Sequence, residues 1–436
     1  MSKIAIQGLG PILKFEEMVD EKLMILIGEQ ASGKSTIAKS IFFCKGISEE
    51  FKKFLMDSEL IKGFSKDQDA FLGFKKQLRT KFMEYFGTTK HMDPFHIKYI
   101  MDNNEFIRID LKSGYANLTF SSNIKTECIK LIKEVREYYF RQDTSRLMNK
   151  MDFNLWSNAR ENVAQKIDME VNRVFEQDYT SVFIPAGRSL LATNSEFFHM
   201  ITPNKYDIIM NDFIERIMLL QKQYSQSMED IVKDRKKFSS EEIDFQSVDK
   251  AIVLVKKILK GEYINEKNGE KIYYESGKFV KLIQASSGQQ ESLWIVLLIF
   301  SIILNNQKVY MVIEEPEAHL FPTAQKDIME LIMLMINTTG SQVIVTTHSP
   351  YILTATNLLM YSSYVEDKSE SSEDIVPIKY RLSSNVVSAY LVKNHGIQNI
   401  MDQENHMVDP STIDEVSEIM NNATDKLIEK ELSNGL

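Results

Sequence analysis

Residues 23–36 read LMILIGEQASGKST, five apolar residues followed directly by a glycine-rich segment. The apolar run predicts a buried strand, and the apolar spacing after Thr36 predicts a helix. Gly28 and Gly33 permit a tight turn between the two, in which successive backbone N–H groups point inward and bind phosphate oxygens. This stretch therefore predicts a nucleoside triphosphate site at the edge of a parallel α/β sheet.

Each residue type in the glycine-rich segment suits one part of a nucleotide. Lys34 is placed to reach the β- and γ-phosphates of ATP, and the Ser35 hydroxyl is placed to ligate Mg²⁺. A purely structural glycine turn is the alternative interpretation, which the later motifs disfavour. The residues of this segment predicted to bind the nucleotide are Gly28, Gln30, Ala31, Ser32, Gly33, Lys34, Ser35 and Thr36.

Composition predicts a globular protein of two lobes. The 436 residues are 43% hydrophobic and 10% aromatic, and the formal net charge of −9 disfavours a surface coated for nucleic acid. The two cysteines, Cys44 and Cys128, have apolar neighbours and suit buried positions in a reducing cytoplasm.

The longest apolar run, residues 293–304, is shorter than the ~20 residues of a membrane span and predicts a core helix. The first ten residues predict a strand, not a signal peptide.

The order of predicted elements divides the chain into four parts. An antiparallel strand pair at the N-terminus leads into the glycine loop, and after residue 288 helices and strands alternate, which predicts a parallel sheet with right-handed crossovers. The predicted parts are an ATPase head (residues 1–47, 180–204 and 262–365), a helical insertion with an antiparallel β meander (48–179), a helical arm (205–261) and a C-terminal strand and helix (366–436).

Two further apolar strands end in polar residues. Residues 309–317 read VYMVIEEPE, where Glu314 suits Mg²⁺ binding through water and Glu315 suits orienting or deprotonating the attacking water. Residues 344–351 read IVTTHSPY, where His348 could hydrogen-bond the γ-phosphate or, alternatively, cap the next helix. Parallel strands place their ligands at their carboxyl ends, so these residues and the glycine loop are expected to meet.

Other polar positions admit two interpretations each. Ser287 and Gly288, in the segment ASSGQQE, lie where a helix begins, which suits anion binding and helix capping alike. Arg188 is a candidate for a polar contact near the nucleotide, and His319 could join the site or support it. Basic clusters at 75–81 and 233–237 are interspersed with acids, which favours solvated helix faces over nucleic-acid contacts.

These motifs together resemble the ABC-type ATPase heads, and within them the OLD, RecF and Septu PtuA group. The resemblance is carried by EEPEAHLFP at 314–322, TTHSP at 346–350 and SSG before the helix at 292–304. It implies a P-loop parallel sheet with an antiparallel β subdomain, helical insertions, and ATP and Mg²⁺ as cofactors. It also implies that Ser287, Gly288 and Gln290 contact the nucleotide of a partner subunit in a head-to-tail homodimer or higher oligomer.

Three functions follow from the resemblance. The first is an ATPase that controls a separately encoded nuclease or toxin in anti-phage defence, since the sequence shows no effector motif of its own. The second is a RecF-like DNA-repair ATPase, which would bind DNA. The third is the motor subunit of a transporter, which the large helical insertions disfavour. We expect no membrane partner and a cytoplasmic location.

Overall fold

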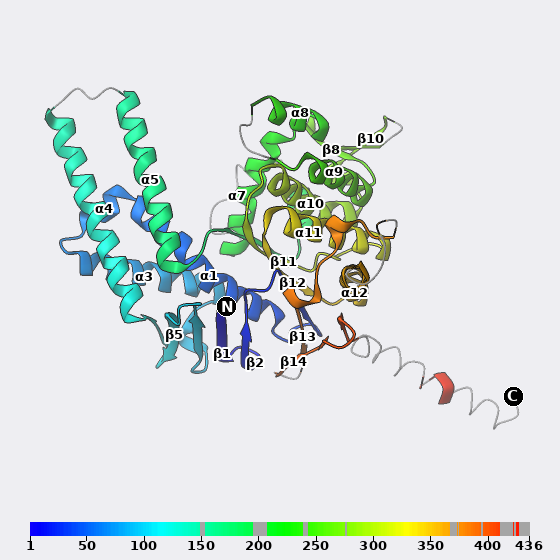
Figure 1. Cartoon of the computed structure of the whole chain (residues 1–436), viewed down its shortest axis with the longest axis horizontal. Coiled ribbons are helices and arrows are strands. Elements are labelled where there is room, and N and C mark those ends of the chain that lie inside the picture. The colour runs from blue at the N-terminus through cyan, green and yellow to red at the C-terminus, as the bar shows by residue number, and fades with distance from the viewer. Residues whose placement is uncertain are drawn as a thin grey trace, which may run out of the picture.

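The computed structural model describes residues 1–148, 153–194, 207–238, 243–274, 277–366, 375–393 and 396–409, with a few isolated residues beyond them. Within this range the chain forms two large sheets with helices around and between them (Figure 1). Nearly all of the C-terminal helix predicted after residue 410 lies outside the described residues.

A six-stranded sheet forms the centre of the molecule. All neighbouring strands are parallel except the edge pair β13–β14. Strand β3 lies between two parallel neighbours and is buried at all five positions, as its unbroken apolar sequence predicts. In spatial order the strands are β14 (Gly396–Asn399), β13 (Val387–Lys393), β3 (Leu23–Ile27), β12 (Gln342–Thr347), β11 (Val309–Glu314) and β7 (Thr180–Ile184).

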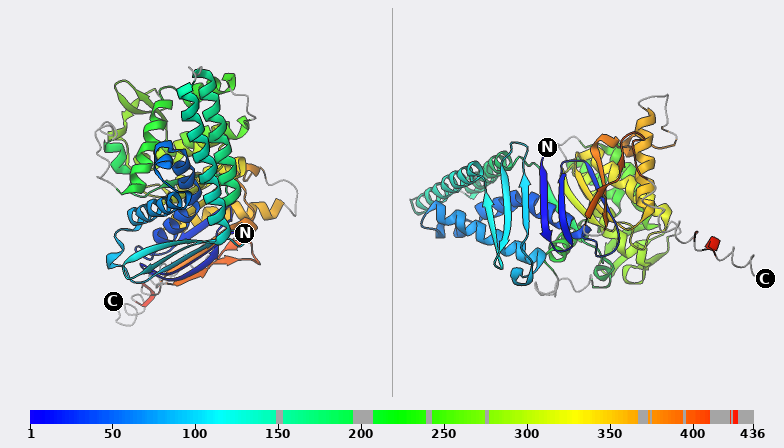
Figure 2. Two further views of the ribbon diagram at one scale, coloured as in Figure 1. Left: turned by 90° about the vertical axis from the view of Figure 1, so that its left-hand side faces the viewer. Right: turned by 90° about the horizontal axis from the view of Figure 1, so that it is seen from below.

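A five-stranded antiparallel sheet lies beside it, as the right-hand view of Figure 2 shows. The structure confirms the predicted N-terminal pair and the predicted meander, and it shows that β1 pairs with β4, which joins them into one sheet. In spatial order the strands are β2 (Ile12–Met18), β1 (Lys3–Leu9), β4 (His96–Ile100), β5 (Phe106–Lys112) and β6 (Tyr115–Phe120).

Helix α1 (Lys34–Met56) packs between the two sheets and shares one core with them. The alternation of the strands sends Met24 and Leu26 of β3 into this core, while Leu23 and Ile25 face the opposite core. That second core is covered by α9 (Phe245–Leu259), α10 (Ser287–Leu304), α11 (Pro322–Thr339) and α12 (Pro350–Glu366).

Helix α10 is long and apolar enough to cross a membrane by length and composition, but 83% of this window is buried inside the protein. It is therefore a core helix, as predicted from its sequence. Both cysteines are buried as predicted, and burial raises the pKa of Cys44 to about 12 and also raises that of Cys128.

The remaining helices surround this centre. α4 (Ser122–Met148) and α5 (Phe153–Phe175) run side by side and project from the antiparallel sheet (Figure 1). We call this pair the α4–α5 arm; it differs from the helical arm predicted at residues 205–261. A second lobe holds α7 (Ile208–Gln223), α8 (Met228–Phe238) and the small sheet β8 (Glu262–Glu266), β9 (Gly269–Tyr273) and β10 (Phe279–Lys281). Helix α3 (Asp67–Phe86) packs against α1 and α4. The short elements are α2 (Ser58–Gly63), α6 (Ser189–Asn194), β15 (Met401–Asp402) and β16 (Met407–Val408).

The predicted division into domains stays a prediction. The structure adds two facts to it. Helix α1 continues across the boundary predicted between residues 47 and 48, and β4 of the predicted insertion pairs with β1 of the predicted head.

A buried ion pair joins α1 to the sheet edge opposite the glycine loop. Lys45 of α1 is 1% exposed, and its Nζ lies 2.9 Å from Asp20 Oδ1 and 3.2 Å from Gln342 Oε1. The same ammonium lies 4.8 Å from the centre of the Tyr310 ring. Burial alone would raise the pKa of Asp20, but Lys45 and a bond from the Ser2 N–H outweigh it and lower that pKa.

We expect Lys45→Met to lower the free energy of unfolding by about 3 kcal/mol, because it leaves the Asp20 carboxylate without its cation. The exposed pair Lys308–Asp178 supplies the control, and Lys308→Met should change the free energy by about 1 kcal/mol or less. Since the pKa of Asp20 is lowered in the folded protein, the pair stabilises at neutral pH and loses this effect as the pH falls through that pKa. The free energies of unfolding of the wild type and Lys45→Met, measured by urea unfolding, should therefore converge as the pH is lowered into the acid range. Equal effects of both substitutions at neutral pH would contradict this prediction.

Candidate functional site

Four neighbouring strands end at one edge of the parallel sheet, and a polar segment follows each of them. The register places Ile27 of β3 beside Thr347 of β12, and Thr346 beside Glu314 of β11. Strand β7 lies on the far side of β11 and leads into residues 185–188. The glycine loop, the two glutamates and the histidine therefore meet because of strand register, as the sequence predicts.

The glycine loop follows a path that only glycine fits at two positions. Gly28 has φ 154°, and a Cβ added there would lie 2.2 Å from the Val392 carbonyl oxygen. Gly33 has φ 110°, and its added Cβ would lie 2.3 Å from Ile12 Cδ1. A larger residue at Gly28 would have to displace the backbone of β13, and one at Gly33 would have to move the Ile12 side chain and adopt a φ that other residues rarely take. The loop conformation therefore depends on both glycines.

Lys34, Glu315 and His348 form a continuous line of polar contacts across three strand ends. Lys34 Nζ donates to the carbonyls of Gly28 (2.8 Å) and Glu29 (2.7 Å) and lies 3.5 Å from His348 Nδ1. His348 Nε2 in turn lies 3.3 Å from Glu315 Oε1. Burial lowers the pKa of Lys34, and the carboxylates nearby, that of Glu315 foremost, partly offset this.

These side chains border an open cavity of about 400 Å³, a size within the range of small-ligand sites. The structure thus brings together nearly the whole glycine loop with Glu315 and His348, and it adds Pro11 and Thr346, which the sequence analysis did not single out. The residues that line the cavity are Pro11, Gln30, Ala31, Ser32, Gly33, Lys34, Ser35, Thr36, Glu315, Thr346 and His348.

Glu314 lies behind this cavity and fits a role in metal binding. It is 7% exposed, its Oε2 accepts a bond from the Ala186 N–H (3.3 Å), and its Oε1 has no hydrogen-bond partner in the part of the chain that the structure describes. No group of three His, Cys, Asp or Glu side chains suited to a metal occurs among the described residues. A metal bound by Ser35 and Glu314 would therefore keep water or phosphate ligands, as Mg²⁺ does.

Glu315 and Glu317 fix the loop that follows β11. Glu315 has φ 46°, a left-handed conformation uncommon outside glycine, and its N–H donates to the Thr346 carbonyl (2.8 Å). Glu317 accepts bonds from the Thr347 hydroxyl (2.6 Å) and the His348 N–H (2.8 Å). Glu317 thus holds His348 in place. The sequence analysis quoted it within EEPE but gave it no role, since the spacing alone does not show where its side chain points.

The N-terminus of α10 lies apart from the cavity just described. Ser286 is its N-cap and forms a reciprocal capping box with Gln289, a pattern readable from the S-x-x-Q spacing. Ser287 is exposed, and Gly288 packs so closely on the turn after β11 that an added Cβ would lie 2.7 Å from the His319 carbonyl oxygen. Neither lines the glycine-loop cavity of the same chain.

Gln290, which the resemblance assigns to a nucleotide contact, is 8% exposed. Its amide donates to the carbonyls of Leu282 (3.0 Å) and Ile283 (3.2 Å). The side chain is thus engaged within its own chain, and its contact with a partner's nucleotide stays a prediction. Arg188 is completely buried and does not line the cavity either; it bonds instead to the backbone of the glutamate turn.

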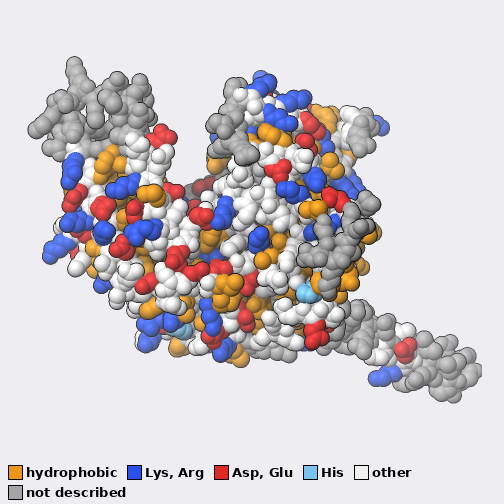
Figure 3. Space-filling model, viewed as in Figure 1, with side chains coloured by type: hydrophobic (Ala, Val, Ile, Leu, Met, Phe, Trp, Pro, Cys, Tyr) orange, Lys and Arg blue, Asp and Glu red, His pale blue; other side chains and the backbone are white. Residues whose placement is uncertain are grey.

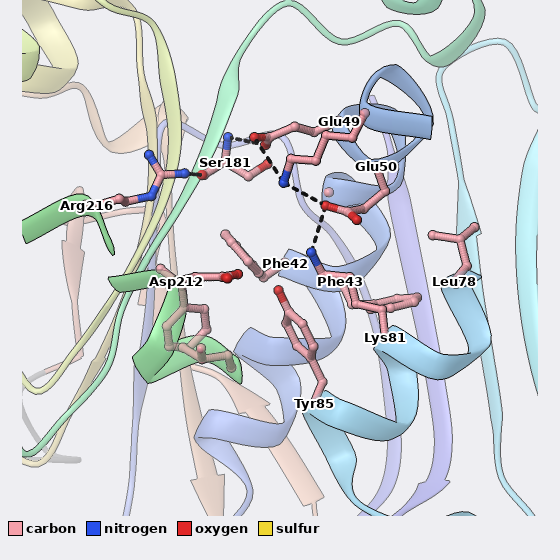
Figure 4. A pocket seen from close by; sticks show the side chains of 14 residues that line it. Phe42, Phe43, Glu49, Glu50, Leu78, Lys81, Tyr85, Ser181, Asp212 and Arg216 are labelled. Carbon is pink, nitrogen blue, oxygen red and sulfur yellow. Dashed lines mark hydrogen bonds and ion pairs between the residues drawn. The ribbon is translucent and has the colours of Figure 1, made fainter. Parts of the chain in front are cut away.

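A second cavity, of about 40 Å³, lies against the opposite part of α1 (Figure 4). Several of its charged lining groups are bonded to their neighbours: Glu50 accepts from Lys81 (2.7 Å) and Lys53 (3.0 Å), and Glu49 accepts from the Ser181 N–H (3.2 Å). These bonds fasten α1 to α3 and β7. The cavity is a tenth of the volume of the glycine-loop cavity and lies at a structural contact, so it is not a candidate site.

The surface shows mixed charge. On the face in Figure 3, Lys and Arg side chains are interspersed with Asp and Glu over the described residues. The cluster at 233–237 illustrates this, because Lys233 pairs with Asp230 (2.8 Å) and Lys237 with Asp234 (3.4 Å). Ion pairs within the helix support the prediction of a solvated face there.

The glycine loop beside a parallel sheet, the adjoining antiparallel sheet and the acidic strand end define a P-loop ATPase head. The family described as AAA ATPase domain matches residues 1–353, so the chain belongs to that family. It is therefore an ATP-binding ATPase. No curated protein sequence gives a significant match.

Solved structures of similar shape are SMC heads. They include the SmcHead bound to the C-winged helix domain of ScpA (TM-score 0.41, 13% identity, covering 91% of this chain and 96% of that one). Another is the SMC head domain from Thermotoga maritima (0.36, 12%, 91% and 97%). A third is the Pyrococcus furiosus Smc head with an extended coiled coil bound to the C-terminal domain of ScpA (0.39, 12%, 96% and 100%). All three TM-scores are below 0.5, so this similarity says nothing about function.

Proposed function

We propose that this ATPase dimerises head to tail around ATP, or assembles further, and controls a separately encoded nuclease or toxin in anti-phage defence in the cytoplasm. The observation that carries the first part is the position of α10. Its N-terminal turn, with Ser287 exposed, does not border the chain's own glycine-loop cavity. Free N–H groups and the helix dipole make such a turn suited to phosphate, which a second copy of the chain would supply.

Within each site we assign roles from the geometry. The N–H groups of residues 28–36 cradle the phosphates, Lys34 neutralises the β- and γ-phosphates, and His348 contacts the γ-phosphate. Glu315 orients or deprotonates the attacking water. The contacts from Lys34 to His348 and from His348 to Glu315 support this arrangement, because they place all three groups at one end of the cavity.

Ser35 and Glu314 would hold Mg²⁺, Glu314 through water. The unpartnered buried Oε1 of Glu314 and the position of Ser35 in the cavity wall both fit this assignment. When bound, Mg²⁺ neutralises charge that develops on the phosphate oxygens.

The proposed control of an effector rests on the resemblance to the OLD, RecF and PtuA group, carried by the motifs at 314–322 and 346–350. The projecting α4–α5 arm and the α7–α8 lobe lie outside the sheets that build the site (Figure 1) and offer docking surface. ATP-dependent dimerisation would change how two such arms are placed, and so could change the state of a bound effector.

We expect a nuclease or toxin encoded beside this gene to co-purify with the chain and to protect cells from phage only when both proteins are present. Glu315→Gln should abolish protection, whereas Glu59→Gln, at a side chain that is 87% exposed, should preserve it. Plaque assays with each variant measure this. If the chain instead purifies alone and binds gapped DNA with a steep salt dependence, the RecF-like repair function replaces this proposal. Co-purification with a membrane permease would favour the transporter function.

A further inference from the structure

Arg188 is a completely buried guanidinium between the acidic strand end and α10. It is 0% exposed, and four of its five N–H donors have partners among the described residues. Nη1 donates to the carbonyls of Pro185 (2.6 Å) and Glu314 (2.7 Å), Nη2 donates to the Glu315 carbonyl (2.9 Å), and Nε donates to the Glu291 carbonyl (3.0 Å).

Two of these bonds bracket one residue. The carbonyls of Glu314 and Glu315 belong to the two peptide planes on either side of the Glu315 Cα, so holding both restricts the φ and ψ of Glu315. This residue has φ 46°, a conformation that persists only where the surroundings hold it. Its backbone conformation sets the direction of the Cα–Cβ bond, and therefore where the Glu315 carboxylate lies relative to His348.

The backbone of Arg188 is bonded to α10. The Glu291 carboxylate accepts the backbone N–H groups of Arg188 (3.1 Å) and Ser189 (2.9 Å), and lies 3.4 Å from Arg188 Nε. Glu291 is 3% exposed and lies about one helical turn beyond Ser287. The turn that presents Ser287 is therefore bonded through Glu291 and Arg188 to the turn that presents Glu315.

We infer that Arg188 is a positioning residue for ATP hydrolysis: it holds the Glu315 backbone in its left-handed conformation and joins this turn to the N-terminal turn of α10. It touches neither the cavity nor a reacting atom. This inference rests on the proposed roles of Glu315 and Ser287. It implies that a displacement of α10, such as docking of a partner's phosphates on Ser287 would produce, is passed to the water-activating carboxylate of the same chain.

The test separates turnover from binding. Arg188→Lys keeps the charge but cannot reach two carbonyls in the planar guanidinium geometry. We expect kcat for ATP hydrolysis to fall roughly 10- to 100-fold, while the Kd for a fluorescent ATP analogue with Mg²⁺ stays within about 3-fold. Arg381→Lys is the matched control, since Arg381 is 5% exposed and its Nε also bonds a backbone carbonyl, that of Val376 (2.7 Å), outside the site. It should leave kcat unchanged.

A double substitution separates this inference from the proposed function. If Arg188 acts through Glu315, then adding Arg188→Lys to Glu315→Gln should cause no further loss of kcat. A full further loss, or a folded Arg188→Lys protein with kcat within 2-fold of the wild type, overturns the inference. Wild-type turnover in Glu315→Gln alone overturns the proposed role of Glu315 instead. If Arg188→Lys does not fold, Glu291→Gln, which weakens the anchor and leaves the guanidinium in place, should show the same change of kcat without a change of Kd.

Discussion

Glu315→Gln is expected to lower kcat for ATP hydrolysis by about 10²- to 10⁴-fold, the range attributed to a positioned general base. The amide that replaces the carboxylate cannot accept a proton from water, yet it has the same shape. ATP binding should therefore persist, because Lys34 and the loop glycines that hold the phosphates are unchanged. Turnover by phosphate release and affinity by equilibrium nucleotide titration measure the two properties separately.

The control for this experiment is Glu59→Gln, the same chemical change at an exposed helix position remote from the sheet edge. It should leave both kcat and affinity as they are. Equal loss of affinity and turnover in Glu315→Gln would indicate that the substitution disturbs the left-handed turn and does not remove a base. Unchanged turnover would transfer the water-activating role to another group, and His348, which lines the cavity and contacts Glu315, lies nearest.

The sequence predicts those parts of the site that depend on residues close to one another along the chain. A buried apolar strand followed by a glycine loop, an acidic pair or a histidine determines which residues stand at a strand end. Parallel register then brings these ends together. The path of the loop at Gly28 and Gly33 is also local, because it depends on a backbone conformation that glycine readily adopts.

What could not be predicted depends on contacts between distant parts of the chain. The pairing of β1 with β4 joins residues about 90 positions apart, and the alternating pattern of either strand is satisfied by many partners. Arg188 was expected near the nucleotide, but the spacing of PAGR after a strand does not show that its guanidinium turns inward to Glu314 and Glu315. The engagement of Gln290 with Leu282 is hidden in the sequence for the same reason.

The second prediction concerns the proposed head-to-tail dimer, in which each ATP site combines the glycine loop of one chain with the N-terminal turn of α10 from the other. We expect ATPase activity to return when two inactive variants are mixed. Ser287→Arg places a bulky side chain at the exposed first turn of α10, where it should clash with the phosphates of the partner subunit and block both sites of a homodimer. Lys34→Ala should also inactivate both sites, by removing the phosphate contact and most of the affinity for ATP.

In a mixed dimer, one site combines Lys34 of the Ser287→Arg chain with Ser287 of the Lys34→Ala chain, and this site is intact. Random pairing of equal amounts makes half of the dimers mixed, each with one of two sites active, so we expect roughly a quarter of the wild-type ATPase activity to return. Mixing Ser287→Arg with a chain that carries both substitutions supplies the control, because no intact site can form and no activity should return. Two outcomes would contradict this prediction. One is that the first mixture stays inactive although both proteins are folded and exchange subunits, and the other is that Ser287→Arg alone hydrolyses ATP at the wild-type rate. Either would mean that each chain hydrolyses ATP without a partner and that Ser287 and its neighbours only cap α10.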